Sequence, residues 1–164
     1  MIGLLELTHF KKSLIGRDLI ENEEIFEMLK KHGTKILYLE SEKEAKKNGQ
    51  IIFAECKKMS ATTKNLLTAG VIEENMLPDF FVIVYKERVK NFTPEQLRIL
   101  IMHELLHIAV EEDSEGKPKY GTNKHDLNDF YYIVQRFGVD WAGDGQITWQ
   151  QILKGNHENV QGED

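Results

Sequence analysis

The sequence has little of what marks secreted or membrane-bound proteins. Cys56 is the only cysteine, so no internal disulfide can form, which suits a reducing cytoplasm. We expect it to be a buried or half-buried small residue rather than a nucleophile. No apolar run is long enough to span a membrane, and Glu6 and His9 interrupt the apolar N-terminus, which argues against a signal peptide. We therefore expect a cytoplasmic protein without a membrane partner.

Basic residues are also scarce. Lysine and arginine number 21 against 27 acidic residues, giving a formal net charge of -6. No dense basic face compensates, so we expect no nucleic-acid partner. With 164 residues, 41% of them hydrophobic and 29% charged, the chain can bury a core of its own. We expect one domain over residues 1–155 and a disordered tail over 156–164.

The most informative stretch reads His-Glu-Leu-Leu-His over residues 103–107, an instance of H-E-x-x-H. On an α-helix, residues four apart lie one turn apart on the same face, so His103 and His107 can bind one metal ion. Glu104 is placed to take a proton from a metal-bound water. The alternative is a pair of core histidines whose rings bond to the backbone. This alternative is less favourable because the motif would then bury two histidines and a glutamate at a cost in free energy.

The flanking sequence predicts that this motif lies on a buried helix. Thr93, Pro94 and Gln96 form a helix start, with a capping residue, a proline suited to the first turn and a residue that closes a capping box. From Leu97 to Val110 there is no glycine or proline, and apolar residues cover a wide face. A helix this apolar packs inside a domain.

A third metal ligand is expected because catalytic zinc usually has three protein ligands and one open position. The segment 111–116 is polar and predicts a loop, and a second helix is expected to open around residues 123–126 and to end at Gly138. His125 would lie at the start of that helix, which could pack back against the motif. Three nearby acids are rival ligands: Glu111, Glu112 and Asp113.

The rest of the chain predicts a small mixed sheet backed by helices, an α+β class. Strands are expected at 35–40, 50–55 and 80–85, helices at 21–32 and 41–47, and a loop with a helical turn over 57–75, while 4–15 fits either type. The last strand, FFVIVY, is apolar throughout and should not be a freely exposed edge. A strand beside a catalytic cleft can receive an extended peptide by edge pairing.

Several polar residues near the motif have more than one interpretation. Asp126 could cap a helix, hold the outer nitrogen of a ligand histidine or be a further acid in the site, and we favour the first two roles over direct ligation. Asp129 is more typical of a solvated or capping residue. Tyr120, Tyr131 and Tyr132 could stabilise an oxyanion, although packing is the commoner role for each.

Residues 80–141 resemble the putative phage metallopeptidase family. The matching elements are the strand FFVIVY, the segment ILIMHELLHI, the segment HDLNDF and the ending FGVDW, with FAEC upstream. The chain is more loosely similar to SprT-like and other minimal zincin domains. The resemblance implies a compact zincin-like core in which a small mixed β-sheet packs against the H-E-x-x-H helix and a following helix carries the third ligand. It implies Zn²⁺ bound by His103, His107 and His125, with Glu104 as general base.

These observations predict a zinc-dependent metallopeptidase that cleaves a peptide or protein substrate by attack of a zinc-bound water. The alternative from another class is a catalytically silent, metal-stabilised interaction protein of a phage or mobile element, which binds a host protein. A hydrolase acting on a non-peptide amide fits the same residues. The sequence does not indicate an oligomeric state.

Overall fold

The computed structural model describes residues 2–43, 46–47, 50–69, 73–125, 129–138 and 140–142. Asp126 and the tail over 156–164 therefore lie outside the described residues. The element order is α1 (Ile2–Asn22), η1 (Glu24–Phe26), α2 (Glu27–Lys31), β1 (Ile36–Ser41), β2 (Lys46–Lys47), β3 (Gln50–Ile51), β4 (Ala54–Lys58), α3 (Ala61–Thr68), η2 (Glu74–Met76), β5 (Phe80–Tyr85), α4 (Lys86–Val89), α5 (Pro94–Leu106), β6 (Ile108–Glu112), β7 (Pro118–Thr122) and α6 (Tyr131–Phe137). The predicted α+β class is confirmed.

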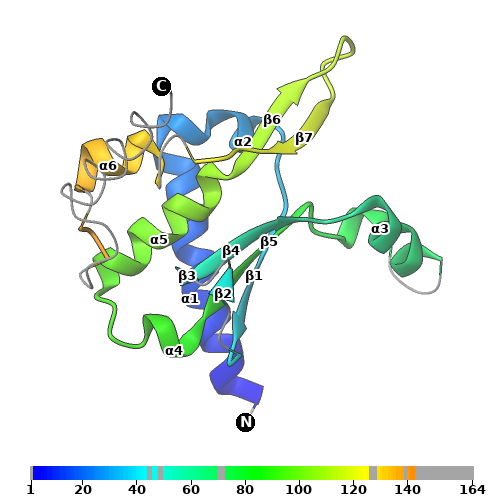
Figure 1. The fold of residues 1–164 in the computed structure, drawn as a ribbon. Helices are drawn as coiled ribbons and strands as arrows, with labels where there is room; N and C mark the ends of the chain where they lie inside the picture. Colours follow the sequence, from blue (N-terminus) through cyan, green and yellow to red (C-terminus); the bar gives the residue numbers. More distant parts are fainter. Residues whose placement is uncertain are drawn as a thin grey trace, which may run out of the picture.

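The main sheet has the strand order β1-β5-β4 (Figure 1). The strand β5 runs parallel to β1 and antiparallel to β4, so the sheet is mixed, as predicted. Phe80, Val82 and Val84 of β5 have no exposed surface and form the centre of the hydrophobic core. The prediction that FFVIVY is not freely exposed is confirmed, because β5 lies between β1 and β4. Among the strands that the structure describes, β4 and β1 are the edges of this sheet.

Two helices, α1 and α5, pack against the core (Figure 1). The start of α5 confirms the predicted capping box, because Thr93 Oγ1 accepts the Gln96 N–H and Gln96 Oε1 accepts the Thr93 N–H. Seven residues of α5 are buried, which confirms the wide apolar face: Ile99, Leu100, Ile101, Met102, Glu104, Leu105 and Leu106.

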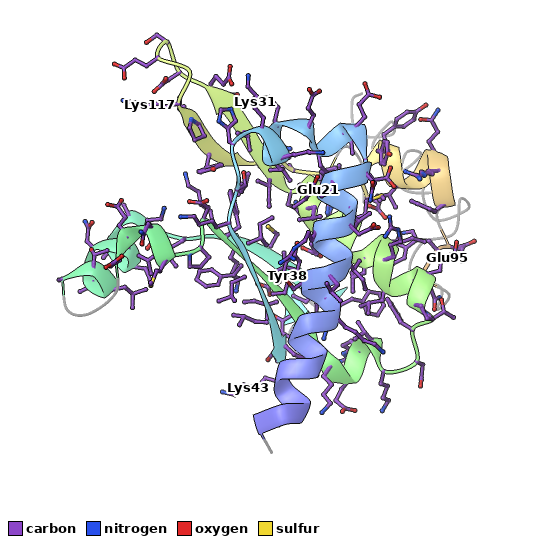
Figure 2. The ribbon with its side chains drawn as sticks, turned by 180° about the vertical axis from the view of Figure 1, so that it is seen from behind. Glu21, Lys31, Tyr38, Lys43, Glu95 and Lys117 are labelled. Carbon is purple, nitrogen blue, oxygen red and sulfur yellow. The ribbon has the colours of Figure 1, made fainter. Side chains whose placement is uncertain are left out.

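The helix ends at Leu106, earlier than the predicted continuation to Val110. Instead the chain turns at His107 and enters β6, which pairs with β7 as an antiparallel hairpin. The loop prediction for 111–116 was therefore wrong for Glu111 and Glu112. Their charges are compatible with a strand because a two-stranded ribbon leaves them exposed to solvent. The hairpin projects from the rest of the fold, with Lys117 near its tip (Figure 2).

The N-terminal third differs from the predictions in two places. Asn22 ends α1 and its side chain donates to Asp18, so it does not cap the following helix. The helix predicted over 41–47 is wrong, because Ser41 ends β1 and Lys46–Lys47 forms β2, paired with β3. The dipeptide Asn48-Gly49 between them is a hairpin signal as much as a helix stop.

Other predictions in this region agree with the structure. The strand expected at 35–40 is β1, the helical turn expected within 57–75 is α3, and the undecided 4–15 belongs to α1. Gly33 follows α2 with a φ of 55°, as expected of a glycine that ends a helix. The strand predicted at 50–55 is divided between β3 and β4. None of the described helices has the length and apolar character needed to cross a membrane.

Close contact between α1 and β1 anchors the N-terminal helix on the sheet. Gly16 of α1 faces the ring of Tyr38, which lies against the helix (Figure 2). Lys12 and Glu40 form a largely buried ion pair across the same interface. We predict that Gly16→Ala destabilises the protein by about 1–3 kcal/mol, because the new methyl group would overlap the Tyr38 hydroxyl. Urea unfolding followed by circular dichroism measures the change.

On an open helix surface the same substitution would stabilise by up to about 1 kcal/mol, so the sign of the effect is decisive. The control is Gly16→Ala in a Tyr38→Ala background, where the overlap is removed and the penalty should fall. A stabilising Gly16→Ala with Tyr38 present would contradict the packing of α1 on β1.

Cys56 is half-buried on β4, as the sequence predicts. Burial, together with the nearby negative charge of Glu104, raises the pKa of its thiol to about 12. At pH 8 about one thiol in ten thousand would then be the reactive thiolate. We predict that iodoacetamide modifies the native protein at least about a hundredfold more slowly than the urea-unfolded chain.

Mass spectrometry of the alkylated protein provides the measurement. The rate in the native state should still rise tenfold per pH unit between pH 8 and 10, whereas an ordinary thiol levels off above its pKa of about 8.5. A plateau near pH 9, or equal rates in the two states, would show that Cys56 is an accessible thiol of ordinary acidity.

Candidate metal centre

Three histidines from two segments of the chain meet at the C-terminal end of α5. His103 lies in the last turns of α5, and His107 follows as its C-terminal cap in helical conformation, with φ -68° and ψ -16°. Their ring centroids are 5.2 Å apart, as the i,i+4 spacing requires. His125 follows β7, and its ring centroid lies 4.8 Å from that of His103 and 4.6 Å from that of His107.

The Nε2 atoms of the three rings, which we call the inner nitrogens, point at one another. His125 Nε2 lies 3.0 Å from His103 Nε2 and 3.0 Å from His107 Nε2. Imidazole nitrogens bound to one tetrahedral zinc ion at 2.0–2.1 Å would be about 3.3 Å apart, so the observed separations are close to those of a ligand triad. Within the described part of the chain, these histidines are the group whose donor atoms could hold a metal ion.

The hydrogen bonds of the outer nitrogens, Nδ1, explain how the inner nitrogens can act as ligands. His103 Nδ1 lies 2.6 Å from Asp129 Oδ1, and His107 Nδ1 lies 2.9 Å from the main-chain oxygen of Asn123. An ionised Asp129 carboxylate and the Asn123 carbonyl can accept hydrogen bonds but cannot donate them. These two partners therefore assign the proton of each ring to Nδ1. The Nε2 atoms of both rings then present lone pairs to His125. His125 Nε2 could donate one hydrogen bond to one of these lone pairs, whereas a metal ion would be bound by all three nitrogens, so the donor set fits a metal ion.

Asp129 is the residue that orients His103. Burial favours its neutral form, but hydrogen bonds from His103, from the Trp141 indole and from the Phe130 N–H lower its pKa below the ordinary value. Asp129 is therefore ionised at neutral pH and can hold the His103 proton on Nδ1. The sequence interpretation gave this role to Asp126 as one option and regarded Asp129 as solvated or capping, which is wrong for Asp129. Asp126 lies outside the described residues.

Aromatic side chains support the cluster from one side. Phe130 is 6% exposed, and its ring centroid lies 4.8–5.3 Å from those of all three imidazoles in edge-on arrangements. Trp141 donates its indole N–H to Asp129 Oδ2 at 2.8 Å, and its carbonyl accepts from the side chain of Gln96 at the start of α5. The HDLNDF and FGVDW segments contain Asp129, Phe130 and Trp141, so the resemblance marked these positions without giving their roles.

Glu104 is almost completely buried beside the histidines, with 3% of its surface exposed. Its carboxylate accepts a hydrogen bond from the Cys56 N–H of β4, and among the described residues Oε2 has no partner. Burial raises the pKa of Glu104 to about 7, with the charges of Glu55 and Asp129 acting in the same direction and His103 opposing them. Such a carboxyl group exchanges protons readily at neutral pH.

His125 is not carried by a helix, which corrects one sequence prediction. It lies in an irregular segment after β7, and α6 begins only at Tyr131, after Phe130 in extended conformation with φ -73° and ψ 135°. The hairpin β6–β7, rather than a return helix, therefore brings the chain back to the motif. The helix prediction relied on periodic apolar residues after residue 126, which do begin a helix, but later than expected.

The acidic rivals for the third ligand position have other partners. Glu112 pairs with Lys31 and His32, and Asp113 accepts the Glu115 and Lys117 N–H groups in the hairpin turn. Glu111 is exposed on β6 and does not belong to the metal-ligand cluster.

The three candidate tyrosines also have contacts or exposure that account for them. The Tyr132 hydroxyl contacts Glu23 and Arg136, and the Tyr120 hydroxyl contacts Thr34. Tyr131 is 60% exposed at the start of α6.

Comparison with known proteins identifies the family. Neither the curated proteins nor the solved structures include a match to this chain. The model of the family described as putative phage metallopeptidase matches residues 10–156, a range that contains the three histidines, Glu104 and Asp129. Because this match covers most of the sequence, the chain belongs to the putative phage metallopeptidase family.

Proposed function

We propose that the protein is a zinc-dependent peptidase in which His103, His107 and His125 hold the metal and Glu104 is the general base. The observation that carries this proposal is the convergence of three imidazole Nε2 atoms beside a buried carboxylate, one oxygen of which has no partner among the described residues. Membership in a metallopeptidase family supports it independently. Three imidazoles favour zinc over magnesium or calcium, which prefer oxygen ligands.

When bound, zinc would polarise the scissile carbonyl and lower the pKa of a water molecule at its open position to about 7. Glu104 takes a proton from the attacking water and passes it to the leaving nitrogen. Its pKa of about 7 suits both transfers at neutral pH. A nearby cation favours the ionised carboxylate, so Glu104 enters the reaction as a base. Asp129 keeps the His103 proton on Nδ1 and thereby directs Nε2 to the metal.

The edge strand β4 gives a place for an extended peptide. Its one partner among the described strands is β5, and the Cys56 N–H bonds to Glu104 rather than to β5. The outer edge of β4 therefore faces the general base. A peptide that adds to this edge by main-chain hydrogen bonds would present its backbone beside Glu104, which favours a peptide or protein substrate over a small amide.

The alternative of a metal-stabilised interaction protein is less well supported. A structural metal site needs its ligands but does not need a buried carboxylate beside them. Glu104 Oε2 is buried without a partner in the part of the chain that the structure describes, which costs about 1–3 kcal/mol or more. A purely structural site has no reason to keep this cost. The position of Glu104 therefore favours catalysis.

We predict that Glu104→Gln retains zinc but lowers peptide hydrolysis at least about a hundredfold, because an amide cannot accept the proton. Zinc content measured by atomic absorption and cleavage of a quenched fluorescent peptide library provide the two readouts. The matched control is Glu112→Gln. Glu112 lies on the hairpin and pairs with Lys31, which is distant in sequence from the H-E-x-x-H motif. Full activity in the Glu104 variant would remove the general-base assignment.

We also predict that His125→Ala lowers zinc affinity at least about tenfold, because one of three protein ligands is lost. Competition with a chromophoric chelator measures the affinity. His32→Ala is the matched control, since His32 is bonded to Glu112 and does not belong to the cluster. Equal zinc affinity in wild type and His125→Ala would mean that another group completes the site.

A further inference from the structure

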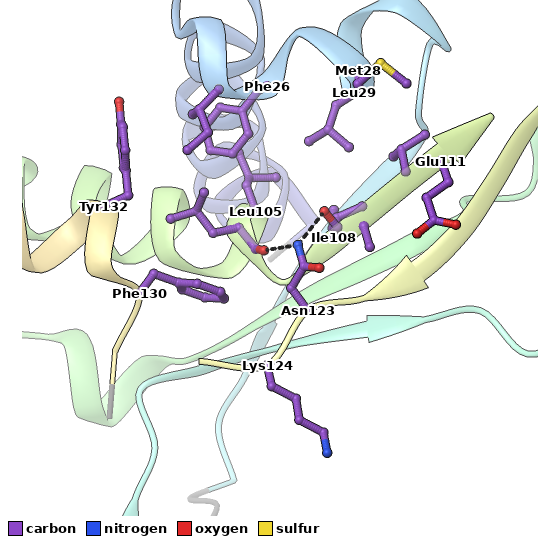
Figure 3. Close-up of a pocket in the computed structure, with 14 residues that line it drawn as sticks. Phe26, Met28, Leu29, Leu105, Ile108, Glu111, Asn123, Lys124, Phe130 and Tyr132 are labelled. Atoms are coloured by element: carbon purple, nitrogen blue, oxygen red, sulfur yellow. Dashed lines mark hydrogen bonds between the residues drawn. The ribbon is translucent and has the colours of Figure 1, made fainter. Parts of the chain in front are cut away.

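Asn123 makes an unusual number of contacts with the end of the motif helix. Its side-chain Nδ2 donates to Leu106 O at 3.0 Å and to Ile108 O at 3.4 Å (Figure 3). Its main-chain N–H donates to His107 O at 2.7 Å, and its main-chain oxygen accepts from His107 Nδ1 at 2.9 Å. One residue thus satisfies three successive carbonyls at the turn from α5 into β6 and also holds a ligand imidazole.

This position links the two halves of the metal centre. The carbonyls at a helix C-terminus have no partners within the helix and must be satisfied from elsewhere. Asn123 satisfies them from the far end of the hairpin, directly after β7, and the chain reaches His125 two residues later. Any displacement of Asn123 would therefore move the acceptor of His107 and the backbone of His125 together.

Asn123 also lies beside a partly open pocket. The pocket has a volume of about 520 Å³, and its lining includes the apolar side chains of Phe26, Leu29, Leu105 and Phe130 (Figure 3). Asn123 itself is exposed, whereas its side-chain hydrogen bonds to the two carbonyls are partly buried. The phenyl ring of Phe130 also contacts the three imidazoles, so the pocket lies directly behind the metal centre.

We propose that Asn123 is a positioning residue of the metal centre, whose side-chain amide clamps the end of α5 so that its own carbonyl fixes His107 and its chain delivers His125. The proposal rests on the ligand set of the proposed function. It assigns to the Asn123 amide a role that alanine or leucine cannot fulfil, because neither side chain has a donor for the two carbonyls.

The test compares Asn123→Leu and Asn123→Ala with wild type. Leucine is close to asparagine in size and neutral, and the apolar pocket wall can accept it, so this variant should fold. Both variants should bind Zn²⁺ about 10–100-fold more weakly in chelator competition, on the scale known for residues that orient ligands. The matched control is Lys124→Ala, whose side chain extends away from the clamp in Figure 3 and should leave zinc affinity unchanged.

Two spectroscopic readouts separate positioning from a general loss of stability. The visible absorption of the Co²⁺-substituted protein should change in intensity and shape in both Asn123 variants, because the ligand geometry changes, and should not change in Lys124→Ala. In zinc-loaded wild type, long-range proton–nitrogen NMR should find the His107 proton on Nδ1, and its resonance should shift in Asn123→Leu.

A lower melting temperature in the Asn123 variants with unchanged zinc affinity and an unchanged Co²⁺ spectrum would overturn the proposal. A proton on His107 Nε2 in the zinc-loaded wild type would overturn it too, whatever the variants do. These measurements do not depend on hydrolysis. A wild type that binds zinc but cleaves no peptide would contradict the proposed function and leave the role of Asn123 intact. Conversely, an active wild type together with Asn123 variants of unchanged zinc affinity and Co²⁺ spectrum would contradict the role of Asn123 and leave the proposed function intact.

Discussion

The hydrogen bonds on the outer nitrogens of His103 and His107 determine what the rest of the site can do. An imidazole can direct Nε2 to a metal only if its proton is on Nδ1, and the acceptors at Asp129 and Asn123 hold the protons there. These acceptors also fix the ring planes, so the rings are oriented before a metal binds. The fold therefore supplies the free energy needed to order the two ligand rings. It does so through the ionised Asp129 carboxylate and the Asn123 main-chain carbonyl.

The fold serves this arrangement by supporting α5 on both sides. The core strand β5 and the long helix α1 pack against the same buried helix, which leaves the C-terminal turn of α5 as the place where polar groups emerge from the core. Glu104 points from this turn to the Cys56 N–H on the sheet edge, while the two histidines point toward His125. One helical turn separates the two ligand histidines of α5, and the proposed base directly follows the first of them.

Much of this could be predicted from the sequence, because the informative signals are local. The capping box at Thr93, the apolar strand FFVIVY and the H-E-x-x-H spacing depend on residues that are neighbours in the chain, and the structure agrees with each of them. His125 was named on spacing and resemblance, and the structure brings it to the other two histidines. The helix expected to carry His125 begins only at Tyr131. The periodic apolar residues predicted that a helix follows, but they did not predict its first residue.

What was not predicted depends on contacts between distant segments. The outer part of the hairpin β6–β7, from Glu111 to Lys119, is polar and exposed, so its sequence does not differ from that of a loop. The roles of Asp129 and Asn123 arise only when the chain returns to the end of α5, where one meets His103 and the other the helix carbonyls. No local pattern distinguishes an aspartate that holds a histidine from one that caps a helix.

The hairpin also has a consequence for how this family can vary. Ile108 pairs with Thr122 at its base, so the two ends of the excursion stay together however long its outer part is. Residues added or removed around the turn at 113–117 would change the number of residues between His107 and His125 without moving either ring. The spacing between the second and third histidines is therefore not fixed by the geometry of the metal centre, and a search pattern that demands a fixed interval would exclude chains with a longer or shorter ribbon.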